Sequence, residues 1–178
     1  MMVIRQSFIR LLKEKPISKI TIKEICEGAD VNRATFYAHY EDQYDLLHKI
    51  ENEVIDNINR TLYSYNLENV ADVPGEMLDK ILNYIKENGE LFDLLLLNSN
   101  ANLQFQRRIT EIIGRLHFSS IAADREDSEY VYLFFANGAI GLIIKWLKDG
   151  MKKPVSEVTE LIMRLSQYGR EGVAVPNS

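Results

Sequence analysis

The chain of 178 residues contains a single cysteine, Cys26, so it can form no internal disulfide and gives no sign of an oxidising compartment. No uninterrupted apolar run approaches the roughly 20 residues that a membrane span needs. The first residues, MMVIRQSFIRLL, have an amphipathic pattern instead of the pattern of a signal peptide. We therefore expect a cytoplasmic protein that does not contact a membrane.

Signals of strands and of catalysis are also missing. No segment shows sustained alternation of apolar and polar residues between hairpin turns. The sequence has no glycine-rich loop for phosphates, no nucleophile elbow and no cluster of metal ligands. We expect an all-α protein that is not an enzyme and that holds no cofactor or metal.

The net charge of −5 is unevenly distributed along the chain. Residues 1–40 contain seven Lys and Arg against four Asp and Glu, a balance of +3, so residues 41–178 carry −8. Nucleic-acid binding relies on the neutralisation of phosphates by basic side chains. A mildly basic N-terminal segment on an acidic body is the asymmetry expected if only that segment meets DNA.

Apolar residues recur at helical spacing along almost the whole chain and predict about nine helices. Residues that start or stop helices stand at the ends of the first four: Pro16, Thr21 with Glu24, Asn32 and Asp42. The third helix is predicted over residues 33–40, and the fourth extends to about Leu62. Further along, two helices should separate near Gly89, and another should end at Gly150 before Pro154 opens the last.

Residues 21–40, TIKEICEGADVNRATFYAHY, consist of a capped helix, a tight turn and a second capped helix, which is the order of a helix-turn-helix. Ala29 lets the two helices approach closely, Val31 fills the corner, and Phe36 reaches back into the core. The outer side of the second helix carries small residues with hydroxyl and nitrogen donors, which suits a helix that enters a major groove. We predict a three-helix DNA-binding domain over residues 1–47 and a C-terminal helical bundle over residues 48–178.

The stretch from Ile20 to Leu47, ITIKEICEGADVNRATFYAHYEDQYDLL, resembles the DNA-binding domain of the TetR family of bacterial transcriptional regulators. The family pattern has a Thr-capped helix, an Ala-Gly-Val turn and a recognition helix that ends in Thr, an apolar residue, Tyr, any residue, His or Tyr, and an aromatic. The resemblance implies that four residues face phosphates or base edges: Thr21, Thr35, Tyr37 and His39. It also implies that the readers of sequence are Asn32, Arg33 and Ala34.

Two residues depart from the family pattern. Asp30 stands where the turn usually has Gly, and we expect it to take a positive φ, which Asp tolerates better than most residues. Gln43 stands where the family usually places a Lys beside a phosphate, and Glu41 and Asp42 precede it. One DNA contact is therefore expected to be weaker, although the helix N-terminus can still face the backbone.

The stretch FFANGAIGLIIKWLKDGMKKPVSEVTELIMRL is similar to the C-terminal region of a TetR subgroup common in Firmicutes, in which the last two helices pack against their mates in a second subunit. Residues 131–147 are apolar on nearly every face, which a single small bundle cannot fully bury. The predicted interface residues are Gly138, Gly141, Leu142, Lys145, Trp146, Leu161 and Leu165. Five aromatics could line a pocket for a small-molecule effector or could be plain core, and the sequence leaves both interpretations open: Phe92, Phe105, Phe118, Tyr130 and Phe134.

These features favour a sequence-specific regulator of transcription that binds double-stranded DNA as a homodimer on a palindromic operator and acts as an effector-responsive repressor. The alternative hypothesis keeps the fold but makes the protein a co-regulator. It would then act mainly by binding another protein, with weak or no DNA binding because of the acidic residues beside Gln43.

Overall fold

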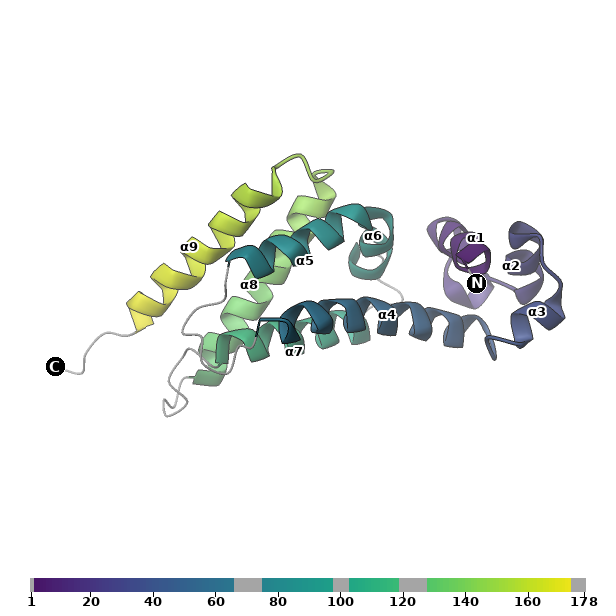
Figure 1. The fold of residues 1–178 in the computed structure, drawn as a ribbon, viewed down its shortest axis with the longest axis horizontal. Helices are drawn as coiled ribbons and strands as arrows, with labels where there is room; N and C mark the ends of the chain where they lie inside the picture. Colours follow the sequence, from purple (N-terminus) through teal and green to yellow (C-terminus); the bar gives the residue numbers. More distant parts are fainter. Residues whose placement is uncertain (1, 66–74, 98–102, 119–127, 174–178) are drawn as a thin grey trace.

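A computed structural model describes residues 2–65, 75–97, 103–118 and 128–173, and in these ranges the chain forms nine α-helices and one short 3-10 helix without any strand (Figure 1). The prediction of an all-α protein with about nine helices is confirmed. The elements in chain order are α1 Met2–Glu14, η1 Ile17–Lys19, α2 Ile22–Ala29, α3 Arg33–Tyr37, α4 Gln43–Tyr63, α5 Gly75–Glu87, α6 Gly89–Leu97, α7 Leu103–Phe118, α8 Ser128–Lys148 and α9 Val155–Val173.

Figure 1 shows α1, α2 and α3 grouped at one end of the molecule, and we call this group the head. The long helix α4 leads from the head into a body formed by α5 to α9. Helix α4 passes without a break through the predicted domain boundary at residues 47 and 48. Head and body are therefore joined by one continuous helix and not by a loop.

The head has a dense core of its own. Its most deeply buried side chains, each at most 1% exposed, are Ile4, Phe8, Ile25 and Phe36, and Leu46 of α4 is buried to the same degree. Helices α1 and α2 approach so closely at Gly28 that an added Cβ would lie 2.4 Å from the Ser7 hydroxyl oxygen. The same hydroxyl donates a 2.9 Å hydrogen bond to the carbonyl of Ile25. A side chain at position 28 would therefore displace the Ser7 hydroxyl and the Arg10 guanidinium.

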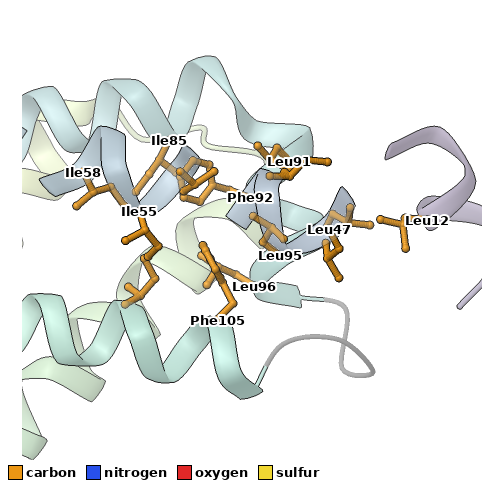
Figure 2. Close-up of a cluster of buried hydrophobic side chains, with 14 of the residues drawn as sticks. Leu12, Leu47, Ile55, Ile58, Ile85, Leu91, Phe92, Leu95, Leu96 and Phe105 are labelled. Atoms are coloured by element: carbon orange, nitrogen blue, oxygen red, sulfur yellow. The ribbon is translucent and has the colours of Figure 1, made fainter. Parts of the chain in front are cut away.

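The core of the body is continuous with that of the head. Figure 2 shows aliphatic and aromatic side chains meeting from α4, α5, α6 and α7, with Leu12 of α1 at the edge of the cluster. Two ion pairs also cross from the head, one between Arg5 and Glu53 and one of 2.9 Å between Lys13 and Glu90. Helix α1 is therefore in direct contact with both α4 and α6.

Helix α8 has two apolar faces. Residues Glu129–Lys148 are long and apolar enough to cross a membrane, although polar residues such as Asn137 and Lys145 interrupt the apolar run. A single helix of this kind is weak support for a membrane span, because core helices of soluble proteins pass the same test. One face is buried against the body, while Tyr130 and Phe134 on the other are 75% and 74% exposed.

The turn from α8 to α9 is closed by Trp146, which is 4% exposed and donates a 2.9 Å hydrogen bond from its indole nitrogen to the carbonyl of Lys153. Gly150 and Met151 both take positive φ in this turn, at 71° and 54°. Helix α8 ends at Lys148 and α9 begins at Val155. The predicted stop at Gly150 and start after Pro154 are thus confirmed.

Candidate nucleic-acid interface

The N-terminus of α2 is fixed by the predicted capping box. The Thr21 hydroxyl accepts from the Glu24 amide at 3.3 Å, and the Glu24 carboxylate accepts from the Thr21 amide at 3.0 Å. A hydrogen bond of 2.5 Å from the Lys15 ammonium, together with the bonds from Thr21, lowers the pKa of Glu24 to about 2. The cap therefore stays charged and closed over the physiological pH range.

The turn between α2 and α3 begins at Asp30, which lies in the left-handed region with φ 52° and ψ 47°. The predicted positive φ is confirmed. The Val31 amide donates to the Cys26 carbonyl at 3.0 Å, which satisfies one of the last free carbonyls of α2. Val31 packs against the core, as a residue that fills the corner of the turn should.

Helix α3 begins at the predicted cap. The side-chain oxygen of Asn32 accepts from the Thr35 amide at 2.8 Å and from the Thr35 hydroxyl at 3.0 Å. Phe36 is fully buried and anchors the inner side of α3 in the core of the head. The helix ends at Tyr37, three residues before the predicted end, because the His39 amide turns to the Phe36 carbonyl in a tighter i to i+3 bond of 3.0 Å.

The residues predicted to contact DNA lie at the head end of the molecule, on α3, on the turn after it and at the N-termini of α2 and α4 (Figure 1). All but one of them are exposed, namely Thr21, Asn32, Arg33, Ala34, Thr35, Tyr37 and His39. Gln43 is half-buried and is the first residue of α4. We call these eight residues, on α3 and at the helix ends beside it, the head surface.

Two residues of α4 that were not predicted from the sequence hold the connection from α3 to α4. Asp45 accepts from the Glu41 amide at 3.0 Å and from the Lys49 ammonium at 2.9 Å, and these bonds hold the pKa of Asp45 below its usual value. Lys49 also donates to the carbonyl of His39 at 2.8 Å. Only the spacing of an acid and a base four residues apart hinted at a role for this pair.

Two family models match the chain. Residues 8–50 match the model described as bacterial regulatory proteins, tetR family, and residues 72–168 match that described as transcriptional regulator C-terminal region. The chain belongs to the TetR family. The N-terminal match covers the helix-turn-helix described above, and both matched regions are described as those of transcriptional regulators.

Individual relatives agree with this assignment. The chain is 20% identical over 182 residues to the uncharacterized HTH-type transcriptional regulator YxbF of Bacillus subtilis strain 168, covering 97% of this chain but 47% of that protein, about half its length. A TetR transcriptional regulator from Streptococcus agalactiae 2603V shares the fold, with a TM-score of 0.68, 22% identity, and 93% and 92% of the two chains covered. The regulator FadR from Bacillus subtilis, solved in complex with stearoyl-CoA, gives a TM-score of 0.68, 16% identity, and 94% and 98% coverage.

The aromatics considered for an effector pocket in this TetR-family chain are not gathered in one place. Phe92 and Phe105 are at most 1% exposed and lie in the body core (Figure 2), where Phe92 meets the Tyr84 ring edge-on at 5.7 Å. Tyr130 and Phe134 lie on the exposed face of α8. Phe118 is the last residue of α7, and its side chain lies outside the described residues.

The residues predicted at a dimer interface divide between the surface and the core. Gly138, Gly141, Lys145 and Leu165 are exposed, and both glycines have open space where a Cβ would point. Leu142 and Leu161 are half-buried. Trp146 lies apart from this surface, because its indole ring is buried within its own chain.

Proposed function

We propose that this TetR-family regulator is a cytoplasmic homodimer that represses transcription from a palindromic operator and is released by an effector. In this proposal residues 1–47 bind DNA and residues 48–178 bind the effector and dimerise. The observation that carries the proposal is the head surface, seven of whose residues are exposed on or near the recognition helix α3. This helix is capped by Asn32 and anchored by the buried Phe36.

The chemistry of the head surface fits a helix that enters a major groove. Arg33 is exposed at the start of α3, where a guanidinium can read the O6 and N7 acceptors of guanine. Ala34 is small enough to let the backbone approach the groove. Tyr37, 57% exposed, offers a hydroxyl for a phosphate oxygen.

Dimerisation is supported by the outer face of α8 and its neighbour α9. Tyr130, Leu133 and Phe134 on α8 are 75%, 43% and 74% exposed, and Leu165 and Tyr168 on α9 are 51% and 67% exposed. Such a row of large apolar side chains is rare on a monomer and is stabilised when a second copy covers it. Two recognition helices would then meet successive major grooves.

Release by an effector follows from differential affinity. A small molecule that fits only a conformation with wrongly spaced heads must lower operator affinity by the same coupling factor. The relative FadR was solved with stearoyl-CoA, which supports a small-molecule effector for this chain without identifying it. The ion pairs of Arg5 with Glu53 of α4 and of Lys13 with Glu90 of α6 connect the head to the helices that would move.

Selection of bound sites from random double-stranded DNA tests the proposal. We expect an enriched palindrome whose half-site spacing is about one helical turn or a small multiple of it. Sedimentation of the complex should give two chains for each site. Failure to enrich any sequence would contradict the proposed function.

The acidic residues near Gln43 favour a second candidate, a co-regulator that acts through another protein. Glu41 and Asp42 are exposed beside the residue that stands where the family usually has a Lys. A salt titration separates the two functions. A DNA-binding regulator should show a steep decline of log K with log salt, whereas the co-regulator should bind DNA weakly at every salt concentration.

A further inference from the structure

The start and the end of the recognition helix are held by different contacts. At the start, Asn32 closes two hydrogen bonds onto Thr35. After Tyr37 the chain continues through residues 38–42 to reach α4, and His39 of the head surface lies in this connection. Any freedom in the connection would therefore change where His39 and Tyr37 stand against DNA.

Two side chains of α4 hold this connection on either side of Tyr40. The ammonium of Lys49 lies 2.8 Å from the carbonyl oxygen of His39, the residue before Tyr40. The carboxylate of Asp45 lies 3.0 Å from the amide nitrogen of Glu41, the residue after it. Lys49 and Asp45 also bond to each other at 2.9 Å, so the two anchors form one unit, which we call the α4 clamp.

Tyr40 is the third point at which the connection is fixed. Its ring is 7% exposed, lies 5.4 Å from the buried Phe36 ring and lies 5.2 Å from the Lys49 nitrogen. The clamp and the buried Tyr40 ring thus hold the connection against the core of the head. A hydrogen-bond donor is needed at position 49 because both of its bonded partners, a carbonyl and a carboxylate, are acceptors.

We propose that Lys49 is a positioning residue for DNA recognition, which acts with Asp45 to keep the end of the recognition helix fixed to α4. The proposal rests on the proposed function, and it extends that function to a residue that does not itself touch DNA. The Lys49 side chain is half-exposed, but its nitrogen already serves a carbonyl, a carboxylate and an aromatic ring of its own chain. When α4 shifts, the clamp carries Tyr37 and His39 with it.

The test compares three variants of the full chain. Lys49→Met keeps the length of the side chain and removes its donors, and Lys49→Arg restores donors for both acceptors. Lys153→Met is the matched control, because it removes an exposed ion pair with a partner four residues away, Glu157 of α9, outside the head. Each protein is measured for affinity to the selected operator, for affinity to random DNA over a range of salt, and for amide hydrogen exchange in residues 38–42 without DNA.

For Lys49→Met we expect the ratio of operator to random-DNA affinity to fall by about tenfold, with an unchanged salt slope on random DNA. The Glu41 amide should exchange faster, also by about tenfold, while Lys49→Arg and Lys153→Met behave like the wild type. An equal loss on both DNAs with a shallower salt slope would make Lys49 a phosphate contact and overturn the proposal. Unchanged Glu41 exchange in Lys49→Met would overturn it as well, even if the wild type had no operator and the proposed function failed.

Discussion

The imidazole Nδ1 of His48 lies 3.4 Å from a carboxylate oxygen of Glu51, one turn further along α4. The Glu51 side chain is 3% exposed, whereas that of His48 is 57% exposed. Burial raises the pKa of Glu51, and the charges of His48 and Arg108 offset part of this rise. A carboxyl group is thus enclosed at the junction of α4 and α7, where Arg108 donates a 2.9 Å hydrogen bond to Asn52.

Glu51 should make the free energy of unfolding depend on pH. Because its folded pKa lies above the unfolded value of 4.5, the stability contributed by the protonated carboxyl is present below pH 4.5 and is lost as pH rises through the folded pKa. We expect Glu51→Gln to raise Tm near pH 7.5 and to change it little near pH 4.5. Thermal unfolding followed by circular dichroism checks this, with the exposed Glu87→Gln as control. A lower Tm for Glu51→Gln near pH 7.5 would contradict the expectation.

Replacing Asp30 with glycine should increase the stability of the folded protein. At φ 52° a side chain meets steric cost that glycine does not, so Asp30→Gly should increase the free energy of unfolding by about 0.5 to 1 kcal/mol. Asp30→Ala should decrease it, because Ala lacks the tolerance of Asp for this conformation. Urea unfolding with an unchanged m-value measures both changes. If Asp30→Gly were less stable than Asp30→Ala, the backbone at this turn would not have positive φ.

Arg33 and Tyr37 should affect DNA binding differently. Arg33→Ala should relax preference at particular base pairs at a cost of about 1 to 3 kcal/mol, because it removes a reader of base edges. Tyr37→Phe should weaken binding to all sequences by a similar factor, because it removes only a hydroxyl for phosphate. Binding to the operator and to single-base variants measures both effects. If neither variant changed binding, the choice of recognition helix would be wrong.

The exposed face of α8 should control dimerisation. Phe134→Lys places a charge at a position that is 74% exposed in the single chain and buried in the proposed dimer, so it should raise the dimer Kd by more than about tenfold. Tyr44→Lys, on an aromatic that is 44% exposed at the start of α4, is the control. Sedimentation over a range of protein concentrations distinguishes them. Equal dimer stability in both variants would place the interface elsewhere.

The features that the sequence predicted well are local ones. The caps at Thr21, Asn32 and Asp42 each depend on an oxygen and an amide two or three residues apart, and the structure confirms all three. The stretch from Val131 to Leu147 is different, because apolar residues on nearly every face do not indicate which face turns inward. Trp146 therefore could not be told from Phe134, although one is 4% and the other 74% exposed.

The α4 clamp escaped prediction for a related reason. The bond from Lys49 to the His39 carbonyl joins residues ten positions apart, and it exists only because the chain reverses direction between α3 and α4. Contacts of this kind depend on tertiary structure, which no local pattern encodes.

Trp146 is the single tryptophan of the chain, and it lies in the body at the turn between α8 and α9. The head contains no tryptophan, so tryptophan fluorescence excited in the intact protein reports on the body alone. Far-ultraviolet circular dichroism, in contrast, reports on every helix. Comparing the two signals during unfolding therefore shows, without any label, whether head and body melt as one cooperative unit.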